Sequence, residues 1–100
     1  MLDWTRPAEE LERRIRAFQP WPGAYTFWEG RLLKVLRAEA LPDSPAGEPP
    51  GRVVPFGNGA AVATGQGLLR LVEVQLEGRN PLPVDAFLRG QKGFIGAVLG

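Results

Sequence analysis

The 100-residue sequence contains no cysteine and no histidine, and no apolar run approaches the roughly 20 residues of a membrane-spanning helix. The lack of cysteine excludes disulfide bonds and thiolate metal sites. The lack of histidine removes the commonest general base and the commonest metal ligand. The only serine, Ser44, lies in a proline-rich stretch with no histidine to activate it. We therefore expect no catalytic residue, no metal and no cofactor in this chain.

Phosphate-binding glycine loops are also missing. Neither GxxxxGK[ST] nor a GxGxxG that opens a helix occurs in the sequence. The glycine-rich stretch at 57–67 lies between predicted strands, where tight turns need residues that accept a positive φ. Hairpin turns therefore explain these glycines better than a nucleotide site does.

The residues that are present suit one soluble domain. Apolar residues make up 44% of the chain and charged residues 23%, which is typical of soluble globular proteins. A chain of this length builds a single core, so we expect 1–100 to form one domain. The first residues lack the basic head and apolar stretch of a signal peptide, which favours a cytoplasmic protein. The apolar, glycine-rich ending at 93–100 fits a disordered tail, a docking segment or an appended sequence.

The first predicted element is an amphipathic helix that ends before Pro20 and Pro22. Its apolar stripe, at helical spacing, consists of Ala8, Leu11, Ile15 and Phe18. Thr5 is the predicted N-cap, and Pro7 falls in the predicted first turn. Three Glu-before-Arg pairs four residues apart are expected on the other faces: Glu9–Arg13, Glu10–Arg14 and Glu12–Arg16.

Five strands are predicted after the helix, at 24–28, 31–41, 52–56, 60–64 and 68–76. In 31–41 the apolar residues change from one face to the other, which indicates a bulge or bend. In 68–76 we expect four residues to face inward: Leu68, Val72, Val74 and Leu76. A short helix is predicted over 84–89, packed by Ala86, Phe87 and Leu88. Short strands joined by glycine turns are typical of a small barrel or sandwich, so the predicted fold is mainly β, with one N-terminal and one short C-terminal helix.

Charge is distributed unevenly although the net charge is only +1. Cationic residues outnumber acidic ones in 6–37 and in 79–100, and acidic residues dominate 38–78. If both ends fold to one side, the domain presents a positive face. Arginine, which suits bidentate phosphate contacts, far outnumbers lysine. The preferred phosphate contacts are Arg31, Lys34, Arg37, Arg79, Arg89 and Lys92.

Two further groups have alternative roles. The helix arginines Arg13, Arg14 and Arg16 either contact phosphate or pair with the neighbouring glutamates. The aromatic residues of the stretch at 18–31 either stack on bases or pack the helix against the sheet, and we favour packing. These aromatic residues are Trp21, Tyr25, Phe27 and Trp28.

Several stretches resemble the C-terminal domain of the methionyl-tRNA formyltransferase family. The first is "DWTRPAEELERRIRAFQPWPGAY" at 3–25, a helix followed by a proline-tryptophan corner. The likeness continues through "RLLKVLRAEAL" at 31–41, "PGRVV" at 50–54 and "VATGQGLLRLVEVQLEGRNPLPVDAFLRG" at 62–90. It covers nearly the whole chain in the same order and departs mainly at "QKGFIGAVLG" (91–100), the stretch that contains Lys92.

This resemblance implies an OB-like open Greek-key barrel preceded by a helix. It also implies a parent enzyme that transfers a formyl group from 10-formyltetrahydrofolate to initiator methionyl-tRNA, using an N-terminal Rossmann-type domain that this chain lacks. The C-terminal domain would hold the tRNA backbone through a positive face. The matching cations are Lys34, Arg37 and Arg79, with Arg13 and Arg16 as weaker matches. The corner at 20–23 would set how the helix lies on the barrel.

Two alternatives remain open at this stage. In the first, the chain is a structural appendage of another formyltransferase, acting on nucleotide sugars or folate, and binds no nucleic acid. In the second, it is a stand-alone binder of single-stranded nucleic acid, which would require exposed aromatic side chains on a strand face.

Overall fold

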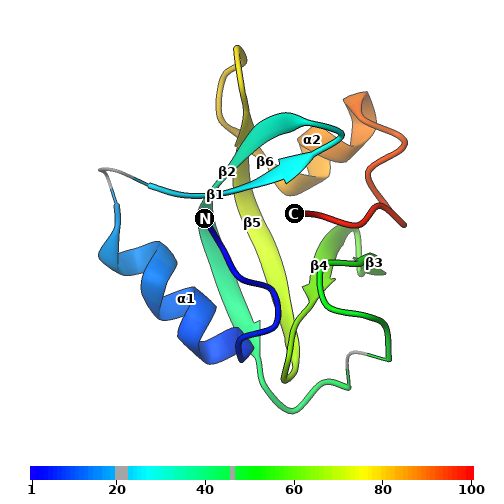
Figure 1. Ribbon diagram of the computed structural model, residues 1–100. Helices are drawn as coiled ribbons and strands as arrows, with labels where there is room; N and C mark the ends of the chain where they lie inside the picture. Colours follow the sequence, from blue (N-terminus) through cyan, green and yellow to red (C-terminus); the bar gives the residue numbers. More distant parts are fainter. Residues whose placement is uncertain (20–22, 46) are drawn as a thin grey trace.

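A computed structural model describes residues 1–19, 23–45 and 47–100 (Figure 1). Its elements in chain order are α1 (Ala8–Ala17), β1 (Ala24–Trp28), β2 (Arg31–Leu41), β3 (Val53–Phe56), β4 (Gly59–Ala63), β5 (Leu68–Leu76), β6 (Leu82–Pro83) and α2 (Val84–Gly90). The strands form one antiparallel sheet in the order β1-β2-β5-β4-β3, with β6 paired to β5. The predicted class, mainly β with an N-terminal and a short C-terminal helix, is confirmed.

The long strand β2 changes its buried face part-way, as its sequence predicts. Leu33 and Val35 are fully buried in the first half, whereas Ala38 packs against the core in the second. The pairing with β5 shifts register on both sides of Arg37. This irregularity rotates the strand, so one strand contributes to the core through residues of both parities.

Helix α1 starts later than predicted. It begins at Ala8, with Pro7 in the N-cap position and no side-chain cap, so the assignment of Thr5 as N-cap is wrong. The Thr5 hydroxyl instead donates to the Asp3 carboxylate at 2.6 Å. Ala8, Leu11 and Ile15 are buried as predicted. Phe18 is not part of this buried stripe, because it lies beyond the last helical residue and is 40% exposed.

Helix α1 also covers a free sheet edge. β1 pairs with β2 only as far as Val35, so the rest of β2 has no strand on that side. There the Gln19 side chain donates to the carbonyl oxygen of Leu36 at 3.1 Å, and the N–H of Ala40 donates to Glu12 Oε1 at 3.1 Å. These bonds occupy main-chain groups that an open edge would expose to another chain.

The core joins both ends of the chain to the sheet. In β5 the buried residues include Leu69 and Leu71, whereas Val72 is only half-buried, so the predicted inward position of Val72 is wrong. The register shift opposite Arg37 explains this, because it breaks simple alternation. From the C-terminal half, Phe94 is fully buried and meets the ring of Trp28 edge to face at 5.3 Å.

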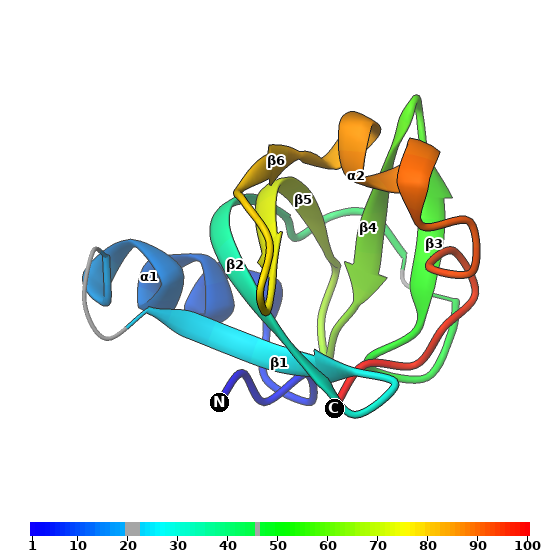
Figure 2. The ribbon, with the colours of Figure 1, turned by 90° about the horizontal axis from the view of Figure 1, so that it is seen from above.

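The segment 93–100 links the two edge strands (Figure 2). On one side the N–H of Val53 in β3 donates to Ala97 O at 2.8 Å. On the other side the N–H of Gly100 donates to Phe27 O in β1 at 2.9 Å. The N-terminal Leu2 also bonds β1, through its N–H and Tyr25 O at 2.8 Å. Both ends of the chain therefore lie on β1. In the described ranges, no helix has the length and apolar character to cross a membrane.

A candidate nucleic-acid interface

The outward face of β1, β2 and β5 carries a row of polar and aromatic side chains. Lys34 in β2 lies directly opposite Tyr25 in β1 and Gln75 in β5. All three are half-buried, and their immediate neighbours in each strand alternate into the core. Because directly paired residues share one face of a sheet, these three side chains form a row across the three strands.

Two arginines flank this row. Arg37 is exposed and lies opposite Glu73, which is two residues from Gln75 on the same strand. The side chain of Gln75 donates to the carbonyl oxygen of Arg79 at 2.9 Å, which holds the turn after β5 beside the row. The pairing thus places Lys34 and Arg37 on one face of β2 and holds the main chain of the Arg79 turn beside the row; we call these three residues the cationic face.

Among the described residues, the three cations of this face form no ion pair, although Glu73 lies opposite Arg37 in the β2–β5 pairing. Across the ranges that the structure describes, none of its three cations lies within 4.0 Å of a carboxylate. Other predicted contacts are paired: Arg16 with Glu12 at 3.7 Å and Arg89 with Asp85 at 3.7 Å. An unpaired surface cation offers its full hydrogen-bonding capacity to an anionic ligand.

Arg31 lies apart from the cationic face. It pairs with Trp28 at the end of the β1–β2 hairpin, and its guanidinium carbon stands 4.6 Å from the centre of the Trp28 ring. It also lies 3.5 Å from a carboxylate oxygen of Glu29. Arg31 and Lys34 differ in strand parity, so their side chains leave β2 on opposite faces. The structure therefore does not bring Arg31 together with Lys34.

The helix arginines lie beside the second half of β2. Glu12, Arg16 and Gln19 share one stripe of the helical repeat, and the first and last of them bond β2 at Ala40 and Leu36. Arg16 therefore lies along the strand that carries Arg37. Arg13 is exposed on the neighbouring stripe, and among the described residues the expected Glu9–Arg13 ion pair is not formed. The other two predicted ion pairs are present: Glu10–Arg14 at 3.5 Å and Glu12–Arg16 at 3.7 Å.

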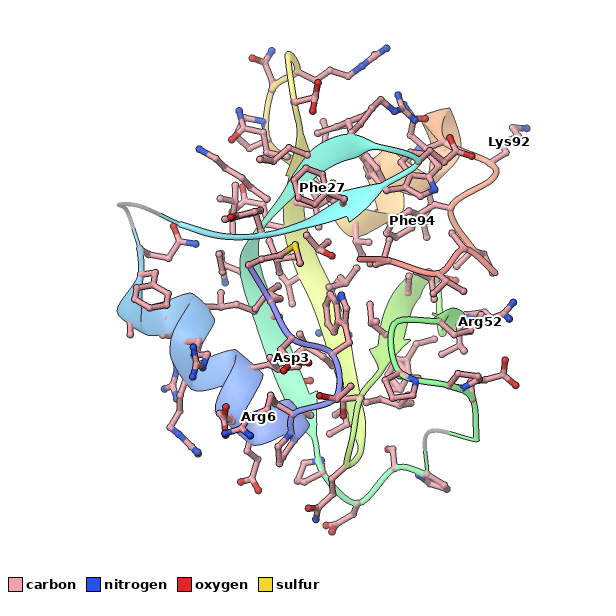
Figure 3. All side chains as sticks on the ribbon, in the orientation of Figure 1. Asp3, Arg6, Phe27, Arg52, Lys92 and Phe94 are labelled. Carbon is pink, nitrogen blue, oxygen red and sulfur yellow. The ribbon has the colours of Figure 1, made fainter. Side chains whose placement is uncertain are left out.

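The C-terminal cations lie around α2. A small pocket of about 110 Å³ is lined by Arg79 and by Gly90 and Gln91 at the end of this helix. Arg89 is on α2 itself and forms its ion pair there. Lys92 is exposed just beyond the helix, where Figure 3 shows it extending away from the molecule.

The aromatic residues divide between core and surface. Trp28 is buried against Phe87 and Phe94 and belongs to the core. Tyr25 and Phe27 are only half-buried, and neither belongs to the buried clusters, whereas Tyr25 lines a pocket together with Arg14 and Phe18 from the end of α1. Their rings meet edge to face at 5.8 Å on the outward side of β1, where Phe27 is visible in Figure 3. Successive side chains of a strand point to opposite faces, so their alternation over 24–28 was the sequence signal that could have predicted which aromatic residues are buried. Trp21 and most of the corner at 20–23 lie outside the described residues.

The shifted pKa values belong to the N-terminal segment and the first turn of α1; Asp3 and Arg6 are labelled in Figure 3. Hydrogen bonds from the side chain and backbone of Thr5 lower the pKa of Asp3. The hydrogen bond from Arg6, at 2.8 Å, lowers the pKa of Glu10. These groups anchor the start of α1. Within the ranges described, no group of three or more acidic side chains is placed to hold a metal ion.

Comparison with known proteins identifies the family. The family model described as formyl transferase, C-terminal domain, matches residues 1–92. The chain belongs to this family. A methionyl-tRNA formyltransferase of Roseiflexus sp. (strain RS-1) is 46% identical over 100 residues, which cover 100% of this chain and 31% of that protein. The enzyme of the same name from Myxococcus xanthus (strain DK1622) is 51% identical over 92 residues, covering 91% of this chain and 28% of that protein. The chain thus spans about a third of the relatives it matches.

A solved structure shares this formyl transferase C-terminal fold. It is HypX from Aquifex aeolicus in complex with tetrahydrofolic acid, with a TM-score of 0.71 and 17% sequence identity. The match covers 94% of this chain and 17% of that one. At this identity the similarity concerns the fold alone.

Proposed function

We propose that this domain holds the initiator tRNA for a methionyl-tRNA formyltransferase in the cytoplasm, as part of translation initiation. In this proposal Lys34, Arg37 and Arg79 contact the tRNA backbone, and Arg13 and Arg16 extend the contact along α1. Formyl transfer from 10-formyltetrahydrofolate to methionyl-tRNA is the task of an N-terminal formyltransferase domain, which is the protein partner of this domain.

The observation that carries the proposal is the ion-pairing pattern of the cations. Arg16, Arg31 and Arg89 each have a carboxylate within 4.0 Å, whereas the three residues of the cationic face have none among the described residues. An unpaired cation contacts phosphate without first giving up an ion pair, whereas Arg16 would have to exchange its exposed pair with Glu12 for the phosphate. Phosphate contacts dominate the affinity of proteins for nucleic acid. The relatives named methionyl-tRNA formyltransferase, similar over 100% and 91% of the chain, favour tRNA as the nucleic acid.

The test is the salt dependence of tRNA binding by the 100-residue chain, followed by fluorescence anisotropy. We expect a dissociation constant of about 10⁻⁴–10⁻⁶ M at physiological salt, weakening steeply as salt rises. Replacing Lys34, Arg37 and Arg79 together by Ala should reduce the slope of log K against log salt by about 2–3 units, since each phosphate contact contributes about 0.7–0.9.

A matched triple variant removes the same charge from elsewhere. Arg6→Ala, Arg52→Ala and Arg70→Ala together lower the net charge equally but leave the cationic face intact. This control should keep most of the slope. If both variants lose the same slope, binding depends on net charge and the residue assignment is wrong. If the unaltered chain does not bind tRNA even at low salt, the domain is a structural appendage.

A further inference from the structure

A hollow with aromatic walls adjoins the cationic face. Its volume is about 280 Å³, and it lies between the end of α1, the first residues of the chain and the start of β1. Its lining includes the aromatic residues Phe18 and Tyr25 and the arginine Arg14, which pairs with Glu10 at 3.5 Å. Phe18 is 40% exposed, although its ring is apolar. Drug-sized ligands occupy pockets of about 300–1,000 Å³, so this hollow suits one planar ring system rather than a large molecule.

Tyr25 connects the hollow to the unpaired charges. It lines the hollow and lies directly opposite Lys34 across the β1–β2 pairing. Side chains in such a pair have Cβ atoms about 4.5–5.5 Å apart. A nucleotide whose base rests on Tyr25 therefore has its phosphate within reach of Lys34, and the next phosphate can follow β2 toward Arg37.

We infer that this hollow takes an unpaired nucleobase of the bound RNA, an inference that rests on the proposed function. Single-stranded nucleic acid is held by aromatic side chains that stack on bases beside cations that track the backbone, and both occur together here. The bases of a duplex are already stacked on one another and cannot enter. An apolar side chain of a protein partner would also fit the hollow, but it would form no ionic contact with the ammonium group of Lys34. The domain therefore holds RNA at a place where a base is free, and not only by its backbone.

The test compares a short single-stranded oligouridylate with an RNA duplex of the same length. Tyr25→Ala should weaken oligouridylate binding about tenfold and leave duplex binding unchanged, because stacking is lost and the charges stay. Tyr25→Trp should retain the oligouridylate affinity. The matched control is Phe56→Ala, which removes another half-buried strand aromatic, from β3. This control should alter neither affinity.

The outcomes separate this inference from the proposed function. If Tyr25→Ala folds normally by circular dichroism and binds oligouridylate as the unaltered chain does, the hollow holds no base, while tRNA binding through the cationic face stands. Equal losses for oligouridylate and duplex overturn the inference in the same way. If Tyr25→Ala does not fold, Tyr25→Leu repeats the test with an aliphatic side chain. Failure of the unaltered chain to bind any RNA overturns both.

Discussion

The indole N–H of Trp4 donates a hydrogen bond to the hydroxyl of Thr26 at 3.0 Å, between the N-terminal segment and β1. Both side chains are buried, with Thr26 fully enclosed. The N–H of Leu2 bonds the carbonyl oxygen of Tyr25, the preceding residue of the same strand. Together these two bonds fix the residues before α1 on β1, and thereby fix one wall of the hollow that Tyr25 lines.

Thr26→Val should destabilise the domain by about 1–3 kcal/mol, because it leaves the buried indole N–H of Trp4 without an acceptor. The same change in a Trp4→Phe background should be nearly neutral, since no donor then remains. Urea unfolding of the four proteins gives the coupling between the two side chains. Equal effects of Thr26→Val in both backgrounds would show that the hydrogen bond contributes nothing.

Gly65→Ala should destabilise the start of α1. The N–H of Gly65 donates to Arg6 O at 3.1 Å, and a Cβ at this position would overlap the carbonyl oxygen of Thr5. Overpacking of this kind costs about 1–3 kcal/mol. In a domain of this size the melting temperature should fall by about 4–8 °C for each kcal/mol. Gly93→Ala is the control, because its Cβ would meet only open space; an equal fall there would contradict the steric explanation.

Local patterns predicted the elements of the fold well. The bounds of β2 and β5 agree with the prediction because turn residues flank clear strand patterns. The role of 93–100 could not be derived in this way. Its apolar residues have no period, and its partners, Val53 and Phe27, lie far away in the sequence. A segment held by such long-range main-chain bonds has no local signature that distinguishes it from a loose tail.

The candidate site was only partly predictable for the same reason. The sequence indicates that Lys34 is on a strand, but it does not show that Gln75 lies opposite and bonds the Arg79 turn. Ion pairs between strands, such as that of Arg70 with Glu39 at 3.7 Å, cannot be predicted from the local spacing of residues either. Which cations are free is therefore a property of the fold, and the contact of the cationic face with tRNA stays a prediction.

Acid should destabilise the N-terminal segment through Asp3. Hydrogen bonds from Thr5 lower the pKa of Asp3 in the folded state. A carboxyl whose folded-state pKa is lowered stabilises the fold above its unfolded-state pKa, and this contribution is lost as the pH falls through the folded-state pKa. Thr5→Val removes the hydroxyl donor, so the pKa of Asp3 should rise toward its ordinary value. An NMR titration of the Asp3 carboxyl carbon measures this.

Thr5→Ser is the matched variant for that titration, because it retains a hydroxyl at the same position. The pKa of Asp3 should stay low in this protein. If Thr5→Val and the unaltered chain give the same titration curve, the hydroxyl at 2.6 Å does not stabilise the carboxylate in solution.

Phe94→Ala should be among the most damaging single changes in the domain. The ring is fully buried and meets those of Trp28 and Phe87 edge to face, at 5.3 and 5.1 Å. Deleting a buried phenylalanine costs about 3–5 kcal/mol, which urea unfolding will measure. The neighbouring Ile95 is 37% exposed, so Ile95→Ala should cost far less.

The same pair of variants tests whether Phe94 holds the C-terminal segment on the sheet. The N–H of Val53 donates to Ala97 O at 2.8 Å, so release of the segment exposes this amide to water. Hydrogen exchange at Val53 should therefore be faster in Phe94→Ala and little changed in Ile95→Ala, because exchange reports local opening. If Val53 exchanges at the same rate in both variants, the bonds that 93–100 makes to β3 and β1 persist without the buried ring. The anchoring of the segment would then lie in its main chain rather than in Phe94.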